Sequence, residues 1–332
     1  MKTRKTTPIV AIAMMLILIL SQAAFAAKPI VAKYAHQGAL GSAMFETANK
    51  FAELVEAKTN GEIKVEVFPN SQLGSGREYL ESMKMGALEF GQAVGGIYSM
   101  FEPQVTVLAL PFLFESREQV YSVLDGPIGE EIYGTLEKHG FKYLGTVENG
   151  FRQLYTIKPV NSIGDLKGIK LRVPEGELYQ KVWKALGVNP TPIPWNECFT
   201  ALQTKVIDGL EPGLVPFETA GLGEVARNIA FINYSYDPDL LSVSTAFWNK
   251  LTEGQQAAIR EATKEAIDFH RARTIEMEKE IEVKLQEKYA TVFTHPDLKP
   301  FQDATRPVLE EFKYIELLNK ILAHIGKDPI EK

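Results

Sequence analysis

The sequence predicts an α/β protein in which mostly parallel sheets are covered by helices. Short alternating or apolar runs, typical of strands, are interleaved with helical patterns along most of the chain, as expected of βαβ units. A further helical pattern runs from Thr252, a candidate N-cap, to about Tyr289 with no interior Pro. It is long by globular standards and its apolar positions do not repeat as in a coiled coil. Because 332 residues fit about two domains, we interpret it as a scaffold helix across both.

The elements follow from local signals. A strand at 33–36 ends in a short loop, and Ser42 is a candidate N-cap for a helix that Gly61 terminates. Ile and Val alternate with charged residues at 63–67, as in a strand with one solvent-facing side. Further strands are expected at 88–94, 141–147, 152–156 and 169–173, with a short strand or turn at 208–211. The run 105–114 carries Pro111 and is expected to be a strand that turns into a loop. Further helices are expected at 77–85, at 177–186 and from a cap at Asn196 to about 204.

The first 26 residues have the pattern of a secretory signal peptide. Lys2, Arg4 and Lys5 precede an apolar run of twelve residues, and Ala24-Phe25-Ala26 forms an A-x-A cleavage signal. The run is short for a membrane span, so we expect cleavage after Ala26 and export to the periplasm. Removal of the three cations takes the formal net charge from -6 to -9.

The composition and the motifs exclude several function classes. The chain is acidic, so a nucleic-acid-binding face is not indicated. Cys198 is the only cysteine, which excludes an intramolecular disulfide and favours a small core residue over a nucleophile. The sequence has no G-x-S-x-G, H-E-x-x-H, C-x-x-C or P-loop motif, and its five histidines are scattered. We therefore predict no catalytic residues, no metal and no cofactor.

Two arginines near strand ends are the main positive signal. Arg172 lies at the carboxyl end of the strand at 169–173, before Pro174, and ligands of open α/β sheets bind at such ends. Arg152 begins a neighbouring strand after the turn Asn149-Gly150. A guanidinium group offers a planar fork that fits a carboxylate. A solvated surface arginine or an internal salt bridge would explain the same pattern for Arg172.

Two further segments carry weaker signals. Prolines at 190, 192 and 194 give a rigid approach to Trp195, which is either a site residue or a core residue beneath the loop. The segment 208–213 is compatible with a plain turn.

Taken together, several segments resemble one family. The chain resembles the solute-binding proteins of tripartite ATP-independent periplasmic (TRAP) transporters, in the dicarboxylate-binding family, from about Ala35 to Phe312. The segments that carry the resemblance are Val67–Gly74, Leu108–Phe114, Asp165–Pro174, Pro190–Pro192, Ala201–Thr204 and Val206–Glu211.

The resemblance implies a two-lobed fold with a hinge, in which the long helix crosses both lobes. Lobe I is expected to comprise 27–149 and about 238–277. Lobe II is expected to comprise 150–237 and about 278–325.

The resemblance also implies the site. Arg172 of the L-R-V-P motif would pair with a ligand carboxylate, Arg152 would lie in or near the site, and Trp195 would line the cleft. The first lobe would contribute from the segments at 36–38 and 94–96. The candidate ligand-binding residues are Arg172, Arg152, Trp195, His36, Gln37, Val94, Gly95, Glu211 and Tyr236.

One departure bears on the ligand. Many relatives have Asn after the D-G-x-E turn, where this chain has Pro212. A backbone group or Glu218 would have to compensate, or the ligand differs. A mono- or dicarboxylate, a sugar acid, or a hydroxy or keto acid remains open.

The resemblance implies capture of a small organic acid and its delivery to a membrane permease, by a protein that we expect to be a monomer. Two alternatives are a binding protein of an ABC importer or receptor, and a periplasmic enzyme acting on an organic acid.

Overall fold

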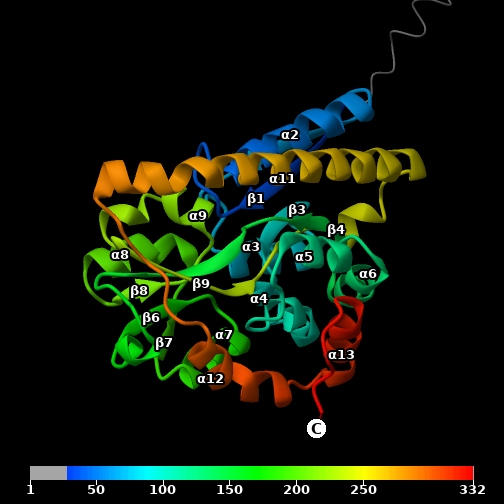
Figure 1. The fold of residues 1–332 in the computed structure, drawn as a ribbon. Helices are drawn as coiled ribbons and strands as arrows, with labels where there is room; N and C mark the ends of the chain where they lie inside the picture. Colours follow the sequence, from blue (N-terminus) through cyan, green and yellow to red (C-terminus); the bar gives the residue numbers. More distant parts are fainter. Residues whose placement is uncertain (1–27, 332) are drawn as a thin grey trace, which may run out of the picture.

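The computed structural model describes residues 28–331 (Figure 1). The predicted signal peptide and its cleavage site lie outside the described residues. Within residues 28–331, no helix is long and apolar enough to cross a membrane.

The first sheet has five strands in the order β2-β1-β3-β10-β4. β1 pairs in parallel with β2 and β3, whereas β10 is antiparallel to β3 and β4. The strands are β1 (Ile30–His36), β2 (Ile63–Phe68), β3 (Phe90–Val94), β4 (Phe141–Val147) and β10 (Asp239–Ser244).

The second sheet has six strands in the order β11-β9-β5-β8-β6-β7. β6 is parallel to β7 and β8, and β11 is parallel to β9, but β5 is antiparallel to both β8 and β9. The strands are β5 (Phe151–Thr156), β6 (Lys170–Val173), β7 (Asn189–Pro192), β8 (Gly209–Leu210), β9 (Asn228–Tyr236) and β11 (Val292–Thr294).

Both sheets are therefore mixed, and the expectation of mostly parallel sheets is only partly correct. The antiparallel pairings all involve β5 or β10. Both strands follow short connections that carry the chain from one sheet to the other, at 148–150 and 237–238. A strand that enters a sheet through such a connection need not follow the direction set by βαβ units.

The helices expected near 42–61, 77–85, 177–186 and 252–289 are present as α2, α3, α7 and α11, whereas α4, α5, α6, α9, α10, α12 and α13 were not predicted. Ser42 caps α2 by accepting a hydrogen bond from the Phe45 N–H, and Thr252 forms a capping box with Gln255 at the start of α11. The α-helices are α2 (Ala43–Lys58), α3 (Gly76–Lys84), α4 (Gly95–Tyr98), α5 (Arg117–Leu124), α6 (Pro127–Gly134), α7 (Glu177–Ala185), α8 (Cys198–Gln203), α9 (Leu214–Thr219), α10 (Thr245–Trp248), α11 (Glu253–Tyr289), α12 (Lys299–Glu310) and α13 (Ile315–His324). The 3-10 helices span Pro103–Ala109, Thr135–His139, Ile163–Leu166, Trp195–Glu197 and Leu222–Glu224.

Two local predictions are wrong. The segment 105–114 is not a strand, because Pro103 begins a 3-10 helix that ends at Ala109. Its residues from Val105 to Ala109 are all buried, and such a run has no periodicity that distinguishes strand from helix. Asn196 is not a helix cap, because it lies inside the 3-10 turn that precedes α8.

α11 runs across the width of the molecule above both sheets (Figure 1). Its first half contributes Ile259, Ala262 and Ala266 to a core cluster with β1 and β2, and its second half contributes Ile281 and Leu285 to a cluster with β9 and α9. The prediction of a helix crossing both lobes is confirmed.

The C-terminal helix α13 lies within the range expected for lobe II but contacts α5 and α6, which lie within the range expected for lobe I. His324 Nε2 lies 3.1 Å from the Ser122 carbonyl oxygen, and Lys320 pairs with Glu131.

Candidate functional site

A cleft lies between the two sheets, and it encloses about 880 Å³ including its opening to solvent. Residues of both lobes line it, together with the connections that join the lobes and the middle of α11. The lining includes Gln37, Ser42, Val94, Glu148, Asn149, Arg152, Arg172, Glu175, Trp195, Pro212, Thr219, Asp239, His270 and Thr274.

Arg172 lies on β6 and lines this cleft, although it is only 5% exposed. Its Nε donates a 2.8 Å hydrogen bond to the carbonyl oxygen of Ile193. Among residues 28–331 no carboxylate lies within salt-bridge distance of it. Burial of a charge without a partner is costly. The four remaining N–H donors of its guanidinium group are therefore available to an anion in the cleft.

Trp195 reaches the cleft from the proline-rich approach that the sequence marks. Its ring lies 5.6 Å from the Arg172 guanidinium carbon, within the range of a cation–π contact. The side chain is only half-buried, which places it on the cleft wall rather than beneath the loop. The Arg172 guanidinium group therefore lies against the weakly hydrated face of the Trp195 ring.

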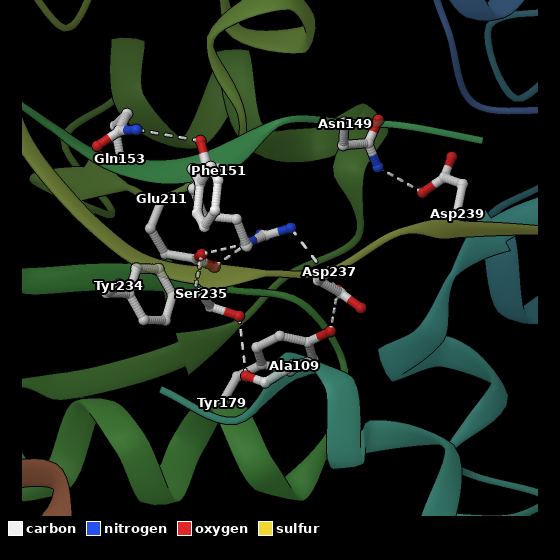
Figure 2. A network of polar contacts seen from close by, with 11 residues as sticks. Ala109, Asn149, Phe151, Gln153, Tyr179, Glu211, Tyr234, Ser235, Asp237 and Asp239 are labelled. Atoms are coloured by element: carbon white, nitrogen blue, oxygen red, sulfur yellow. Dashed lines mark hydrogen bonds and ion pairs between the residues drawn. The ribbon is translucent and has the colours of Figure 1, made fainter. Parts of the chain in front are cut away.

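Arg152 also lines the cleft, but it has an internal partner. Its Nε and Nη2 donate to the two carboxylate oxygens of Glu211 at 2.6 and 3.0 Å, and both side chains are almost fully buried. The Tyr234 hydroxyl donates to the same carboxylate. Burial is the largest single influence and lowers the pKa of Arg152, but the charge and hydrogen bonds of Glu211, together with Tyr234 and Asp237, outweigh it, so that the pKa rises overall. Figure 2 shows Glu211 and Tyr234 within one buried polar network.

The network continues to Asp237, in the connection between β9 and β10. Arg152 Nη1 lies 3.7 Å from Asp237 Oδ2, and the Tyr179 hydroxyl of α7 donates to the same carboxylate (Figure 2). Burial raises the pKa of Asp237 to about 6. Tyr179 packs directly on Gly96 of the first lobe, where a Cβ atom would collide with its ring. Through Tyr179, α7 of lobe II therefore contacts both Asp237 in the β9–β10 connection and Gly96 of lobe I.

Only some of the candidate lobe I residues line the cleft. Gln37 and Val94 line the cleft, whereas His36 and Gly95 do not. His36 is fully buried; its Nδ1 accepts a 3.1 Å hydrogen bond from the Gly38 N–H, and burial lowers its pKa to about 4. Gly95 faces Asp237, because a Cβ atom there would lie 3.0 Å from its Oδ1.

Two candidates of lobe II also lie away from the cleft surface. Glu211 is fully buried against Arg152, and Tyr236 packs edge-to-face on Phe151 with ring centroids 5.3 Å apart. Pro212 lines the cleft, but Glu218, the side chain that could replace the missing amide, does not. The turn is pressed against the interlobe connection, since a Cβ atom on Gly213 would collide with the Asn149 carbonyl oxygen.

Sequence reasoning missed several polar residues that line the cleft. Asp239 is the first residue of β10, Asn149 lies in the other connection, and Thr274 lies on α11. Asp239 stands among apolar strand residues at 240, 241 and 243, and a buried acid at the start of an apolar strand is a usable signal. Thr274 lies on the buried stripe of a helix and gives no such signal.

Asp239 is held by two amides. Asn149 Nδ2 donates to Oδ1 at 2.6 Å, and Gln92 Nε2 donates to Oδ2 at 3.1 Å. Burial raises the pKa of Asp239 to about 7.

Within the described part of the chain, no group of three or more His, Cys, Asp or Glu side chains is placed to hold a metal ion.

Residues 34–315 match the family of bacterial extracellular solute-binding proteins, family 7. The chain belongs to this family. It is 30% identical over 297 residues to the sialic acid-binding periplasmic protein SiaP of Vibrio cholerae, which covers 89% of this chain and 92% of that protein.

Solved structures of TRAP periplasmic solute-binding proteins have the same fold as this family 7 protein. One from Xanthobacter autotrophicus, with bound β-D-galacturonate, superposes with a TM-score of 0.86 at 31% identity, over 90% of this chain and 100% of that chain. One from Sulfurospirillum deleyianum, with bound succinate, gives 0.84 at 28% identity, over 89% and 98%. The expected two-lobed α/β fold and the resemblance to TRAP solute-binding proteins are confirmed.

Proposed function

We propose that this family 7 protein captures a small organic acid in the interlobe cleft and delivers it to a membrane permease. The observation that carries the proposal is Arg172, a buried arginine on the cleft wall with no carboxylate partner among residues 28–331. The ligand carboxylate supplies the missing partner. The solved relatives with bound galacturonate and succinate, both carboxylates, support this chemistry.

Each of the candidate contacts has a separate role. Arg172 binds the carboxylate through its free N–H donors, and the Trp195 ring packs against the ligand. Arg152 already gives two N–H groups to Glu211, so it supports the site with its remaining donors. Gln37 and Val94 close the cleft from lobe I.

Charge pairing alone does not give tight binding. A hydrogen bond to a charged group contributes about 1.5–3 kcal/mol, whereas micromolar affinity requires about 8 kcal/mol. Burial against Trp195 and Val94 adds to the sum. Because both lobes line the cleft, a ligand that contacts both shifts the protein toward its closed form.

The proposed setting follows from the N-terminal signal and the family. The chain is exported, acts in the periplasm as a monomer and docks on a permease in its closed form. It releases its ligand unchanged, without catalysis. The periplasmic description of SiaP supports this location.

A thermal-shift screen of the mature protein tests the proposal. A ligand at 1,000 times its Kd stabilises the native state by about 4 kcal/mol, which raises the Tm by several degrees. We expect responses among mono-, di- and keto-carboxylates or sugar acids. A response to neutral sugars or amines alone would overturn the carboxylate mechanism. Mass spectrometry of the recovered ligand checks that it is unchanged, and turnover would reassign the protein as an enzyme.

A further inference from the structure

Some charged side chains that line the cleft form salt bridges within the protein, and others do not. Of the lining arginines, Arg152 is neutralised by Glu211. Of the lining carboxylates, Glu148 is paired with Arg117 of α5. Glu175 also lines the cleft without a cationic partner among residues 28–331, but it is only half-buried. Within the same residues, Arg172 is the lining cation without an acidic partner, and Asp239 is the nearly fully buried lining carboxyl without a cationic one.

Asp239 is oriented by a chain of hydrogen bonds. The Tyr34 hydroxyl donates to Gln92 Oε1 at 2.7 Å, which turns the Gln92 amide nitrogen toward Asp239. Asn149 donates to the other carboxyl oxygen from the opposite connection (Figure 2). A carboxylate has about four acceptor positions, and these amides use two. The remaining positions can accept hydrogen bonds from ligand hydroxyl groups in the cleft.

Thr274 gives a second, independent indication. Its side chain is 1% exposed and lines the cleft, yet its hydroxyl has no hydrogen-bond partner among the described residues. Buried hydroxyl groups are normally paired. A ligand hydroxyl is the group that would satisfy it, because a hydroxyl both donates and accepts.

We propose that the cleft selects a polyhydroxylated monocarboxylate, of the sugar-acid class, and discriminates against dicarboxylates. This inference rests on the proposed function, since it assumes that Arg172 binds one carboxylate. Asp239 of lobe I and Thr274 of α11 then bind the ligand hydroxyls. A second ligand carboxylate would meet the unpaired Asp239, and the lining residues offer it no second unpaired cation beyond Arg172.

Isothermal titration of the mature protein against matched acids tests the selectivity. Galactonate carries one carboxylate and several hydroxyls, galactarate replaces the terminal alcohol with a second carboxylate, and hexanoate has no hydroxyls. We expect galactonate to bind at least tenfold more tightly than either of the other two. Tighter binding of galactarate or hexanoate, or equal affinities, would overturn the inference.

Two variants assign the selectivity to residues. Asp239→Asn removes the charge at nearly constant shape, and it should reduce the preference for galactonate over galactarate at least tenfold. Asp268→Asn, at an exposed position of α11, is the matched control and should preserve the preference. Thr274→Val should weaken galactonate binding severalfold and leave hexanoate binding unchanged. An Asp239→Asn protein that keeps the wild-type preference would refute the role of Asp239.

The Thr274→Val measurement and the wild-type comparison remain decisive if Asp239→Asn does not fold. The same titrations separate the two proposals. If no acid binds, or if Arg172→Gln binds acids as well as the wild type does, the proposed function fails and this inference fails with it. If acids bind through Arg172 but galactarate is preferred, only the selectivity inference fails.

Discussion

Replacing Arg172 with glutamine should separate ligand binding from folding. The wild-type side chain gives Nε to the Ile193 carbonyl oxygen and keeps four donors for a carboxylate. Glutamine retains two neutral N–H donors, so the variant loses the charge assistance of one or two hydrogen bonds. At about 1.5–3 kcal/mol for each such bond, with partial recovery through the amide, the net loss is about 2–4 kcal/mol. This corresponds to a rise in Kd of about 30- to 700-fold.

The same substitution should not reduce the stability of the ligand-free protein. Arg172 is a nearly fully buried charge without an acidic partner in the described chain, and such a charge opposes folding. The free energy of unfolding of the apo variant should therefore equal or exceed that of the wild type. Functional sites commonly carry groups that cost stability in this way.

Isothermal titration with the acid that the wild type binds best measures the affinity, and urea unfolding measures the stability. Arg172→Lys should also weaken binding, because an ammonium group cannot fork across two carboxylate oxygens. Arg227→Gln, at an exposed arginine of lobe II, is the control and should bind normally. Unchanged affinity in Arg172→Gln would refute the assignment of Arg172 as the carboxylate partner.

Three further predictions concern the polar groups between the lobes. Glu211→Gln leaves the buried Arg152 charge without its main partner, so urea unfolding should show a loss of about 3–5 kcal/mol, and a loss below 1 kcal/mol would contradict this view. Burial raises the pKa of Asp239 from 3.8 to about 7. Between pH 3.8 and about 7 the native state therefore binds more protons than the unfolded state, and the contribution of Asp239 to stability falls as the pH rises through this range. Asp239→Asn should remove up to about 1.4 kcal/mol per pH unit of that dependence, and identical pH profiles for the two proteins would count against it. Gly96→Ala should displace Tyr179 and weaken ligand binding, and a titration indistinguishable from that of the wild type would show that this interlobe contact is dispensable.

Part of the fold was predictable because its signals are local, whereas elements such as β9, β10, α12 and α13 were not predicted. The Ser42 and Thr252 caps mark the starts of α2 and α11 through side chains that bond to backbone groups three residues away. The alternation at 63–67 likewise identifies β2. The segment 105–114 could not be assigned, because the buried residues from Val105 to Ala109 carry no strand or helix period.

The site was only partly predictable. The strand end at Arg172 and the prolines before Trp195 are local features that indicate the cleft. The pairing of Arg152 with Glu211 joins residues 59 positions apart, and nothing in the sequence around either shows that one neutralises the other. Asp239 is a visible acid at the start of an apolar strand and Thr274 lies on the buried stripe of a helix, but neither pattern shows that the side chain lines the cleft, because that depends on how the two lobes meet.

The placement of α11 bears on how the protein unfolds. One continuous helix contributes buried side chains to core clusters at both of its ends, and a third cluster joins residues of both lobes, including Tyr79 and Trp183. If one lobe unfolds, the other lobe therefore loses buried packing contacts of its own core. The two halves should therefore melt in a single cooperative transition, and calorimetric and van't Hoff enthalpies should agree, although the chain has the length of two domains.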